Sequence, residues 1–186
     1  MNVHLVCNAH LDPAWLWELD EGAAEVLSTF RIAADICDQY QNFVFNHNEA
    51  ILYEWVREYD PELFARIQRL VLEGKWHIMG GWFLQPDCNM PSGESFVRQI
   101  LVGRTFFAKH FGVTPTTAIN FDPFGHTRGL VQILAKAGYT SYIACRPGRD
   151  TLTLPADHFR WVGYDGSTVT VARRPEGYNS NLGEAV

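Results

Sequence analysis

One stretch decides how the rest of the chain is interpreted, and it reads Ala118-Ile119-Asn120-Phe121-Asp122-Pro123-Phe124-Gly125-His126-Thr127. The apolar run from Thr116 to Asn120 predicts a short buried strand. This strand leads Asp122 into a turn that Pro123 stiffens and Gly125 opens. An isolated Asp-Pro most often caps the helix that follows, so the turn by itself does not identify a site.

A second stretch, near the start of the chain, has the same design. His10-Leu11-Asp12-Pro13-Ala14-Trp15 follows the apolar run Val3 to Cys7, which predicts another strand. His10 and Asp12 lie two residues apart in a segment expected to be extended, so their side chains leave the backbone on the same side. Together they can hold one cation, to which Asp122 can add a third ligand from a neighbouring strand. One nitrogen and two carboxylate oxygens suit zinc or a similar divalent ion, with a fourth position left open.

Predicted strands alternate with predicted helices along the chain. The predicted strands are Val3–Cys7, Phe43–Phe45, Trp76–Met79, Thr116–Asn120 and Ser141–Ala144. The predicted helices run from about Glu21 to Tyr40, from Asn48 to Glu58, from an Asp60-Pro61 cap to Gly74, from Glu94 to His110, and from Gly129 to Ala137. The alternation predicts an α/β sheet or barrel with parallel strands and a site at their carboxyl ends.

The end of the chain has a different character. Phe159 to Gly163 and Thr168 to Arg173 predict a hairpin on an Asp165-Gly166 turn, and the polar stretch Asn179 to Val186 follows. A complete barrel takes about 200–250 residues or more. With 186 residues and five predicted strands before the hairpin, the chain is expected to hold an incomplete barrel.

Composition excludes several classes of protein. Hydrophobic residues make up 47% of the chain, which is enough for a real core. The net charge of -6 and the lack of a basic cluster argue against a nucleic acid or an anionic membrane as partner. Four widely spaced cysteines are expected to be reduced, no apolar run has membrane-spanning length, and the first predicted strand leaves no room for a signal peptide. The sequence therefore predicts a cytoplasmic protein.

Four motifs carry a resemblance to a known family: His10-Leu11-Asp12-Pro13-Ala14-Trp15, Gly80-Gly81-Trp82, Arg98-Gln99 and Asp122-Pro123-Phe124-Gly125-His126. In this order they resemble the N-terminal catalytic domain of glycoside hydrolase family 38, the zinc-dependent retaining α-mannosidases, over roughly residues 3 to 175. The resemblance implies an irregular parallel β/α barrel of the seven-stranded type, related to that of some polysaccharide deacetylases. Residues 1–186 would form the N-terminal part of that domain, incomplete at its C-terminal end.

The resemblance also implies roles for individual residues. His10, Asp12 and Asp122 would bind zinc, and Asp122 would also be the nucleophile that forms a mannosyl-enzyme intermediate. Trp15 and Phe124 would line the pocket for the terminal mannose of an oligosaccharide or glycan substrate. In the family, a fourth zinc ligand (a His) and the acid/base Asp lie well downstream of the nucleophile, and neither can be matched in this chain.

Three further polar residues are weighed on their own. Asp87, in the Pro86-Asp87-Cys88-Asn89 loop, is predicted to contact substrate, although a structural Asx turn explains it equally well. His126 is expected to hydrogen-bond the Asp122 turn rather than touch substrate. His47 follows the second predicted strand and is expected to be structural.

Two alternatives to a mannosidase stay open. The chain could belong to a metal-dependent carbohydrate deacetylase-like hydrolase, although the stiff turn around Asp122 favours a glycosidase nucleophile. It could also be a catalytically inert fragment that only binds carbohydrate. Cleavage of an aryl α-mannoside, release of acetate, or binding without turnover would distinguish the three. The sequence does not indicate an oligomeric state.

Overall fold

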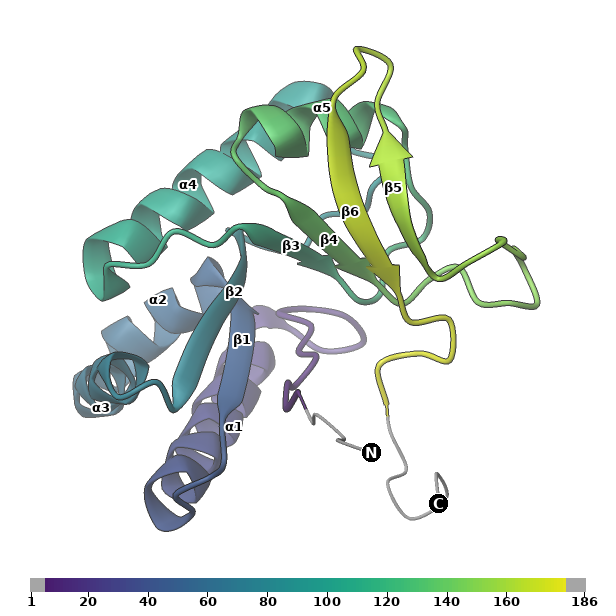
Figure 1. The fold of residues 1–186 in the computed structure, drawn as a ribbon. Helices are drawn as coiled ribbons and strands as arrows, with labels where there is room; N and C mark the ends of the chain where they lie inside the picture. The colour runs from purple at the N-terminus through teal and green to yellow at the C-terminus, as the bar shows by residue number, and fades with distance from the viewer. Residues whose placement is uncertain (1–5, 180–186) are drawn as a thin grey trace. The chain divides into compact units, whose positions relative to one another are not determined.

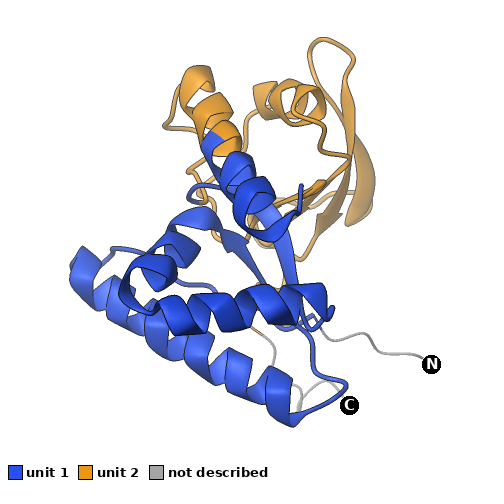
Figure 2. Cartoon of the chain, turned by 90° about the vertical axis from the view of Figure 1, so that its left-hand side faces the viewer, with its two compact units in different colours: residues 1–84, 102–114 blue, residues 85–101, 115–186 orange. Residues whose placement is uncertain are grey.

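The computed structural model describes residues 6–179, which fall into two compact units. Unit 1 takes the described residues up to Leu84 together with Val102–Thr114, and unit 2 takes Gln85–Leu101 together with the described residues from Pro115 onward (Figure 2). The elements follow one another as α1 (Leu19–Gln39), β1 (Phe45–Glu49), α2 (Ala50–Tyr59), α3 (Pro61–Leu72), β2 (Trp76–Trp82), α4 (Gly93–Phe111), β3 (Thr117–Asn120), α5 (Gly129–Lys136), β4 (Ser141–Ala144), β5 (His158–Val162) and β6 (Thr168–Arg173) (Figure 1). Helix α4 contributes residues to both units.

The sheet of unit 1 has two parallel strands, β1 and β2, which the chain connects through α2 and α3 (Figure 1). Phe45 pairs with Trp76, and His47 pairs with Ile78. Cys7 adds an isolated parallel bridge to Phe45. Because parallel strands need a crossover rather than a tight turn, this arrangement confirms the predicted α/β alternation.

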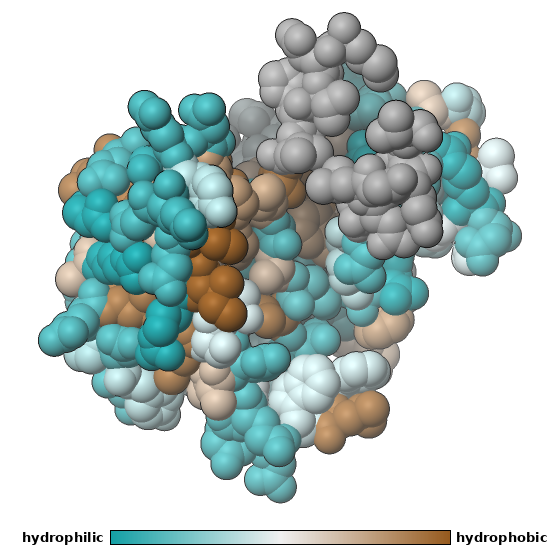
Figure 3. Space-filling view, turned by 90° about the horizontal axis from the view of Figure 1, so that it is seen from below, coloured by the Kyte–Doolittle hydropathy of each residue, from teal (hydrophilic) through white to brown (hydrophobic). Residues whose placement is uncertain are grey.

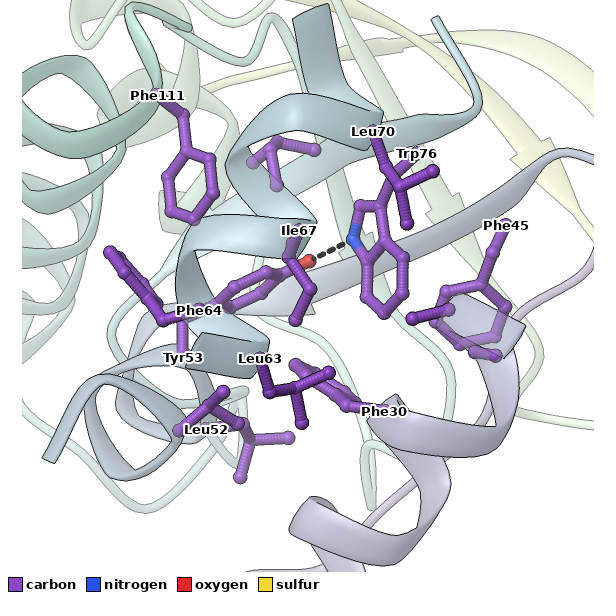
Figure 4. Close-up of a cluster of buried hydrophobic side chains, with 14 of the residues drawn as sticks. Phe30, Phe45, Leu52, Tyr53, Leu63, Phe64, Ile67, Leu70, Trp76 and Phe111 are labelled. Carbon is purple, nitrogen blue, oxygen red and sulfur yellow. Dashed lines mark hydrogen bonds between the residues drawn. The ribbon is translucent and has the colours of Figure 1, made fainter. Parts of the chain in front are cut away.

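Aromatic and aliphatic side chains together fill the core of unit 1 (Figure 4). The ring of Phe30 on α1 contacts the rings of Tyr53 on α2 and Trp76 on β2, with centroids 5.0 and 5.2 Å apart. The indole Nε1–H of Trp76 donates a 2.8 Å hydrogen bond to the hydroxyl of Tyr53, so these two buried polar groups satisfy one another. Burial of this aromatic surface joins α1 and α2 to the sheet.

Unit 2 contains a four-stranded sheet in the order β3–β4–β6–β5 (Figure 1). Strands β3, β4 and β6 are parallel, and β5 pairs antiparallel to β6 as the hairpin predicted on Asp165-Gly166. The ladder pairs Asn120, the last residue of β3, with Ala144, the last residue of β4. The segments that follow these two strands therefore leave the sheet at the same edge.

Most predicted elements are confirmed, with small shifts at their ends. Asp60 caps α3 as expected, because its carboxylate accepts a 3.0 Å hydrogen bond from the backbone N–H of Leu63. The predicted strand Ser141–Ala144 coincides with β4. Strand β2 continues to Trp82, whereas the prediction ended it at Met79.

The prediction for β1 was wrong. A strand was expected over Phe43–Phe45 and a helix from Asn48, but β1 spans Phe45–Glu49 and α2 begins at Ala50. Four of its five residues are polar, so periodicity does not identify it as a buried strand. All five are nevertheless buried, because the strand pairs with β2 inside unit 1.

Some predictions fall beyond the described part of the chain. Of the predicted first strand, Val3–Cys7, residues 3–5 lie outside it, and the same holds for residues 180–186 of the predicted polar end. The two sheets belong to different units, so the closure of a barrel stays a prediction.

The surface carries hydrophilic residues with smaller hydrophobic patches between them on the face drawn in Figure 3. Single exposed apolar residues are ordinary on protein surfaces and require no explanation. Within residues 6–179, every helix is too short or too polar to cross a membrane.

Candidate functional site

The first group of candidate site residues lies in unit 1, in the loop between Cys7 and α1. Nε2 of His10 lies 3.3 Å from Oδ1 of Asp12. Two such atoms bound to one tetrahedral zinc, each at about 2.0–2.2 Å, would stand about 3.4 Å apart. The chemistry and the spacing of this pair therefore fit two ligands of one zinc ion.

Strand β1 holds three consecutive residues of the chain that leads into this loop, Cys7, Asn8 and Ala9. The carbonyl of Cys7 accepts hydrogen bonds from the backbone N–H and the side-chain Nδ2 of Asn46, at 2.9 and 2.6 Å. Nδ2 of Asn8 donates to the carbonyl of Asn46 at 2.9 Å. Nε2 of His47 lies 2.8 Å from the carbonyl oxygen of Ala9. The backbone leading into His10 is thus tied to the sheet residue by residue.

The hydrogen-bond partners of His47 determine its tautomer. Its side chain is buried, and burial lowers the pKa of His47 from 6.5 to about 3, so the imidazole is neutral near pH 7. The backbone N–H of Asn48 donates to Nδ1 at 2.9 Å. Nδ1 is therefore the acceptor, and Nε2 carries the hydrogen that it donates to Ala9. This confirms the structural role expected for His47.

Trp15 extends from the same loop into solvent, with 69% of its surface exposed. The loop folds back on the start of α1, where a Cβ added to Gly22 would lie only 2.1 Å from the carbonyl oxygen of Pro13. Nε1 of Trp17 donates to the carbonyl of Asp12 at 3.1 Å, and the Trp17 ring meets that of Trp15 edge-on at 5.4 Å. Trp15 is accessible to a ligand on this loop, and its contact with a sugar stays a prediction.

The second group lies in unit 2, directly after β3. Nε of Arg146 donates a hydrogen bond to Oδ1 of Asp122, and this interaction raises the pKa of Arg146. The guanidinium also lies 5.6 Å from the centroid of the Phe124 ring, which is itself exposed. An arginine cation therefore contacts both the candidate nucleophile and a candidate substrate-binding ring.

Sequence reasoning missed Arg146, although a signal was present. Arg146 follows the last residue of β4 by two positions, as Asp122 follows the last residue of β3. Those last residues, Asn120 and Ala144, pair in the parallel ladder. Equal offsets after two neighbouring parallel strands bring the two side chains to the same edge of the sheet.

His126 supports the site in a different way from the one predicted. Its Nε2 lies 2.8 Å from the carbonyl of Arg146, and the hydroxyl of Tyr142 lies 3.2 Å from its Nδ1. Burial lowers the pKa of His126, which favours a neutral ring that donates from Nε2 and accepts at Nδ1. The prediction of a hydrogen bond to the Asp122 turn was wrong, since His126 holds the backbone of Arg146, and Arg146 holds Asp122.

Asp87 forms an Asx turn. Its Oδ1 accepts hydrogen bonds from the backbone N–H groups of Asn89 and Met90, at 2.7 and 3.3 Å. Asn89 then donates from Nδ2 to the carbonyl of Phe124 at 3.4 Å. Gly125 has φ +135°, and an added Cβ would lie 2.0 Å from Nδ2 of Asn89. The Asp87 loop therefore packs on the Asp122 turn, and a direct contact with substrate stays a prediction.

The structure brings some of the predicted site residues together within each unit. His10 and Asp12 form a pair in unit 1, whereas Asp122 and Phe124 share Arg146 in unit 2. No three His, Cys, Asp or Glu side chains gather as a metal-binding group among residues 6–179. The role of Asp122 as the third zinc ligand stays a prediction.

Comparison with known proteins identifies the family. The model of the glycosyl hydrolases family 38 N-terminal domain matches residues 1–184. The chain belongs to glycoside hydrolase family 38. This confirms the resemblance read from the four motifs.

Two curated α-mannosidases match nearly the whole chain. α-Mannosidase G of Dictyostelium discoideum is 35% identical over 180 residues, which cover 96% of this chain and 17% of that protein. α-Mannosidase 2C1 of Mus musculus is 32% identical over 170 residues, which cover 91% of this chain and 16% of that protein. The chain spans about one sixth of the length of these relatives.

A solved α-mannosidase structure has the same fold. The crystal structure of an α-mannosidase from Enterococcus faecalis V583 superposes with a TM-score of 0.84 at 21% identity, covering 94% of this chain and 20% of that chain. The mixed α/β architecture with parallel strands is therefore shared with a solved α-mannosidase structure.

Proposed function

We propose that this chain is the N-terminal part of the catalytic domain of an α-mannosidase, which removes terminal α-linked mannose from oligosaccharides or glycans with retention of configuration. The observation that carries the proposal is the Asp122 turn, where a carboxylate at the end of a parallel strand is held by Arg146. Membership of family 38 and the names of the relatives support the choice of substrate.

Asp122 is assigned the role of nucleophile. Arg146 binds Oδ1, so Oδ2 is assigned the attack on the anomeric carbon. The C–O bond to the leaving group breaks as the new ester bond forms, and a water molecule later hydrolyses this mannosyl-enzyme intermediate. A retaining enzyme also requires a second carboxyl group about 5–5.5 Å away to protonate the leaving oxygen. No residue of this chain is assigned that role.

His10, Asp12 and Asp122 are proposed to hold a zinc ion, since the donor set and the spacing of the His10–Asp12 pair fit one. When bound, the zinc supplies a Lewis acid for the hydroxyl oxygens of the mannose. Trp15 and Phe124, both exposed, are proposed to pack against the sugar ring.

The wider proposals follow the sequence expectations. The chain is proposed to contribute the first strands of a seven-stranded β/α barrel. A cytoplasmic location is supported by its cysteines, because Cys7, Cys37, Cys88 and Cys145 are all free thiols in the structure.

The test is hydrolysis of an aryl α-mannoside by the protein that carries this chain, followed by NMR of the first-formed sugar. We expect the α-anomer of mannose to appear first, as retention requires. First-formed β-mannose would contradict the retaining mechanism. Release of acetate from an acetylated sugar without mannoside cleavage would favour the deacetylase alternative, and binding without turnover would favour a binding module.

Metal content of the same protein tests the zinc proposal separately. Elemental analysis should find about one zinc per chain in the wild type and much less in Asp12→Ala, because one ligand is removed. Asp20→Ala, an exposed aspartate on α1, serves as the matched control and should keep the metal. Equal zinc in wild type and Asp12→Ala would show that Asp12 is not a ligand.

A further inference from the structure

Strand β1 buries four successive polar side chains beneath the His10 loop. Asn46, His47, Asn48 and Glu49 expose between 1% and 4% of their surfaces. Strands of parallel sheets are normally rich in Val, Ile and Leu, because both of their faces are covered. Buried polar groups are normally hydrogen-bonded, and a fully satisfied network holds the groups that it joins in fixed positions. The bonds of His47 and Asn46 lead to the backbone just before His10.

Packing restricts the ring of His47. The rings of Phe30, Phe45 and Tyr53 lie 5.1, 6.4 and 6.2 Å from it, centroid to centroid. The donation from Asn48 N–H to Nδ1 fixes which side of the ring faces the strand. Nε2–H is therefore a donor with little freedom to move, directed at the carbonyl of Ala9.

That carbonyl is coupled to His10 by covalent geometry. The C=O of Ala9 and the N–H of His10 belong to one planar peptide unit. A hydrogen bond that fixes the direction of the carbonyl therefore fixes the plane from which the His10 side chain departs. Both ring nitrogens of His47 are already engaged, so His47 is not itself a metal ligand in this arrangement.

We propose that His47 is a positioning residue for zinc: by donating from Nε2 to the carbonyl of Ala9, it holds His10 in the orientation that binds the ion together with Asp12. This inference rests on the zinc site of the proposed function. Removing groups that orient metal ligands typically costs about 10–100-fold in metal affinity.

Two substitutions at position 47 separate positioning from general stability. The side-chain amide of Gln can reproduce the Nε2–H donor, and the side-chain oxygen of Asn can reproduce the Nδ1 acceptor. His47→Asn keeps the contact to Asn48 and loses the one to Ala9, whereas His47→Gln does the reverse. The two variants are thus matched controls for each other.

The first measurement is the zinc affinity of each protein, starting from its metal-free form, by competition with a chromophoric chelator. The melting temperature of each metal-free form is measured as well. We expect His47→Asn to bind zinc about 10–100-fold more weakly than the wild type. His47→Gln should stay within about threefold of the wild type, whatever its melting temperature. Equal zinc affinity in all three proteins would overturn the inference, and so would losses of affinity that follow the melting temperature alone. Either result would leave the proposed zinc site itself standing. A wild type that binds no zinc would refute the zinc proposal itself, and this inference with it.

A second measurement uses the wild type alone, so it does not depend on whether the variants fold. Coupling is reciprocal, so if the His47–Ala9 bond favours zinc, zinc must favour that bond by the same factor. We expect zinc to slow the hydrogen exchange of the His47 Nε2–H, followed by NMR, by about 10–100-fold. Nε1–H of Trp76, bonded to Tyr53 in the core, is the control. Slowing of both protons alike, or of neither, would reject the inference.

Discussion

In unit 1, the loop that carries His10 rests on neutral, buried groups of β1, whereas in unit 2 the Asp122 turn is held by an arginine whose side chain is 50% exposed. The first arrangement is insensitive to salt and becomes weaker only if a buried histidine is forced to accept a proton. The second is electrostatic and partly screened by water. The comparison teaches that the two candidate loops are positioned by different forces, and that different conditions will disturb them.

The two loops also share a feature, because each presents one aromatic ring to solvent. Trp15 is 69% exposed in unit 1, and Phe124 is 73% exposed in unit 2. Neither ring contributes much to the core, so truncating either one tests its predicted contact with a ligand at little cost in stability. Four predictions follow from the differences and the similarity between these loops.

The largest expected effect concerns Asp122. Asp122→Asn should reduce turnover of an aryl α-mannoside by about 10³-fold or more, because a neutral amide is a poor nucleophile. The melting temperature should change little, because Asp122 contributes only a partly exposed ion pair to the fold. Asp150→Asn, at an exposed position of the same unit, is the control and should keep full activity. A loss below tenfold in Asp122→Asn would refute the nucleophile assignment.

Acid should weaken unit 1 through His47. Since burial lowers the pKa of this group to about 3, an unfolded chain takes up a proton below about pH 6.5 that the folded unit excludes. Lowering the pH from 7 to 5 should therefore cost about 2 kcal/mol from this group. Urea unfolding of the metal-free protein at both pH values, in wild type and His47→Gln, measures it. The variant should lose less stability than the wild type, and an equal loss in both would contradict the buried, neutral histidine.

The exposed rings should matter for binding and not for folding. Trp15→Ala and Phe124→Ala should each raise KM for a mannoside about tenfold, equivalent to about 1.4 kcal/mol. Because both rings are exposed, unfolding free energies should stay within about 0.5 kcal/mol of the wild type. Tyr59→Ala, an exposed ring at the end of α2, is the control for KM. An unchanged KM in Trp15→Ala would remove that residue from the site.

The smallest effect is expected for the stability contributed by Arg146. Arg146→Met should lower the unfolding free energy by less than about 1 kcal/mol, and the difference should shrink in high salt. Arg98→Met, which removes an exposed ion pair with Glu94 on α4, provides a matched reference. A loss well above that of Arg98→Met, independent of salt, would show that the Asp122 turn is held as firmly as the loop of unit 1.

Local features of the fold could be predicted because they depend on neighbouring residues. Asp60 caps α3 through Leu63, three residues away, and the Asp165-Gly166 turn joins β5 to β6. The same holds for the pairing of His10 with Asp12, which are two residues apart and lie 3.3 Å from each other. In each case the interaction closes a short loop, so the order of the residue types is sufficient to indicate it.

Contacts between distant segments could not be predicted in this way. The sequence alone determined the α/β alternation, the candidate residues His10, Asp12 and Asp122, and the family that their motifs resemble. Only the tertiary structure decided that polar β1 is a buried strand and that Arg146 reaches Asp122 across 24 positions of the chain. The reason is physical: hydrophobic periodicity records which side of an element is buried, and it carries no signal where buried groups are polar and satisfied by partners from another strand.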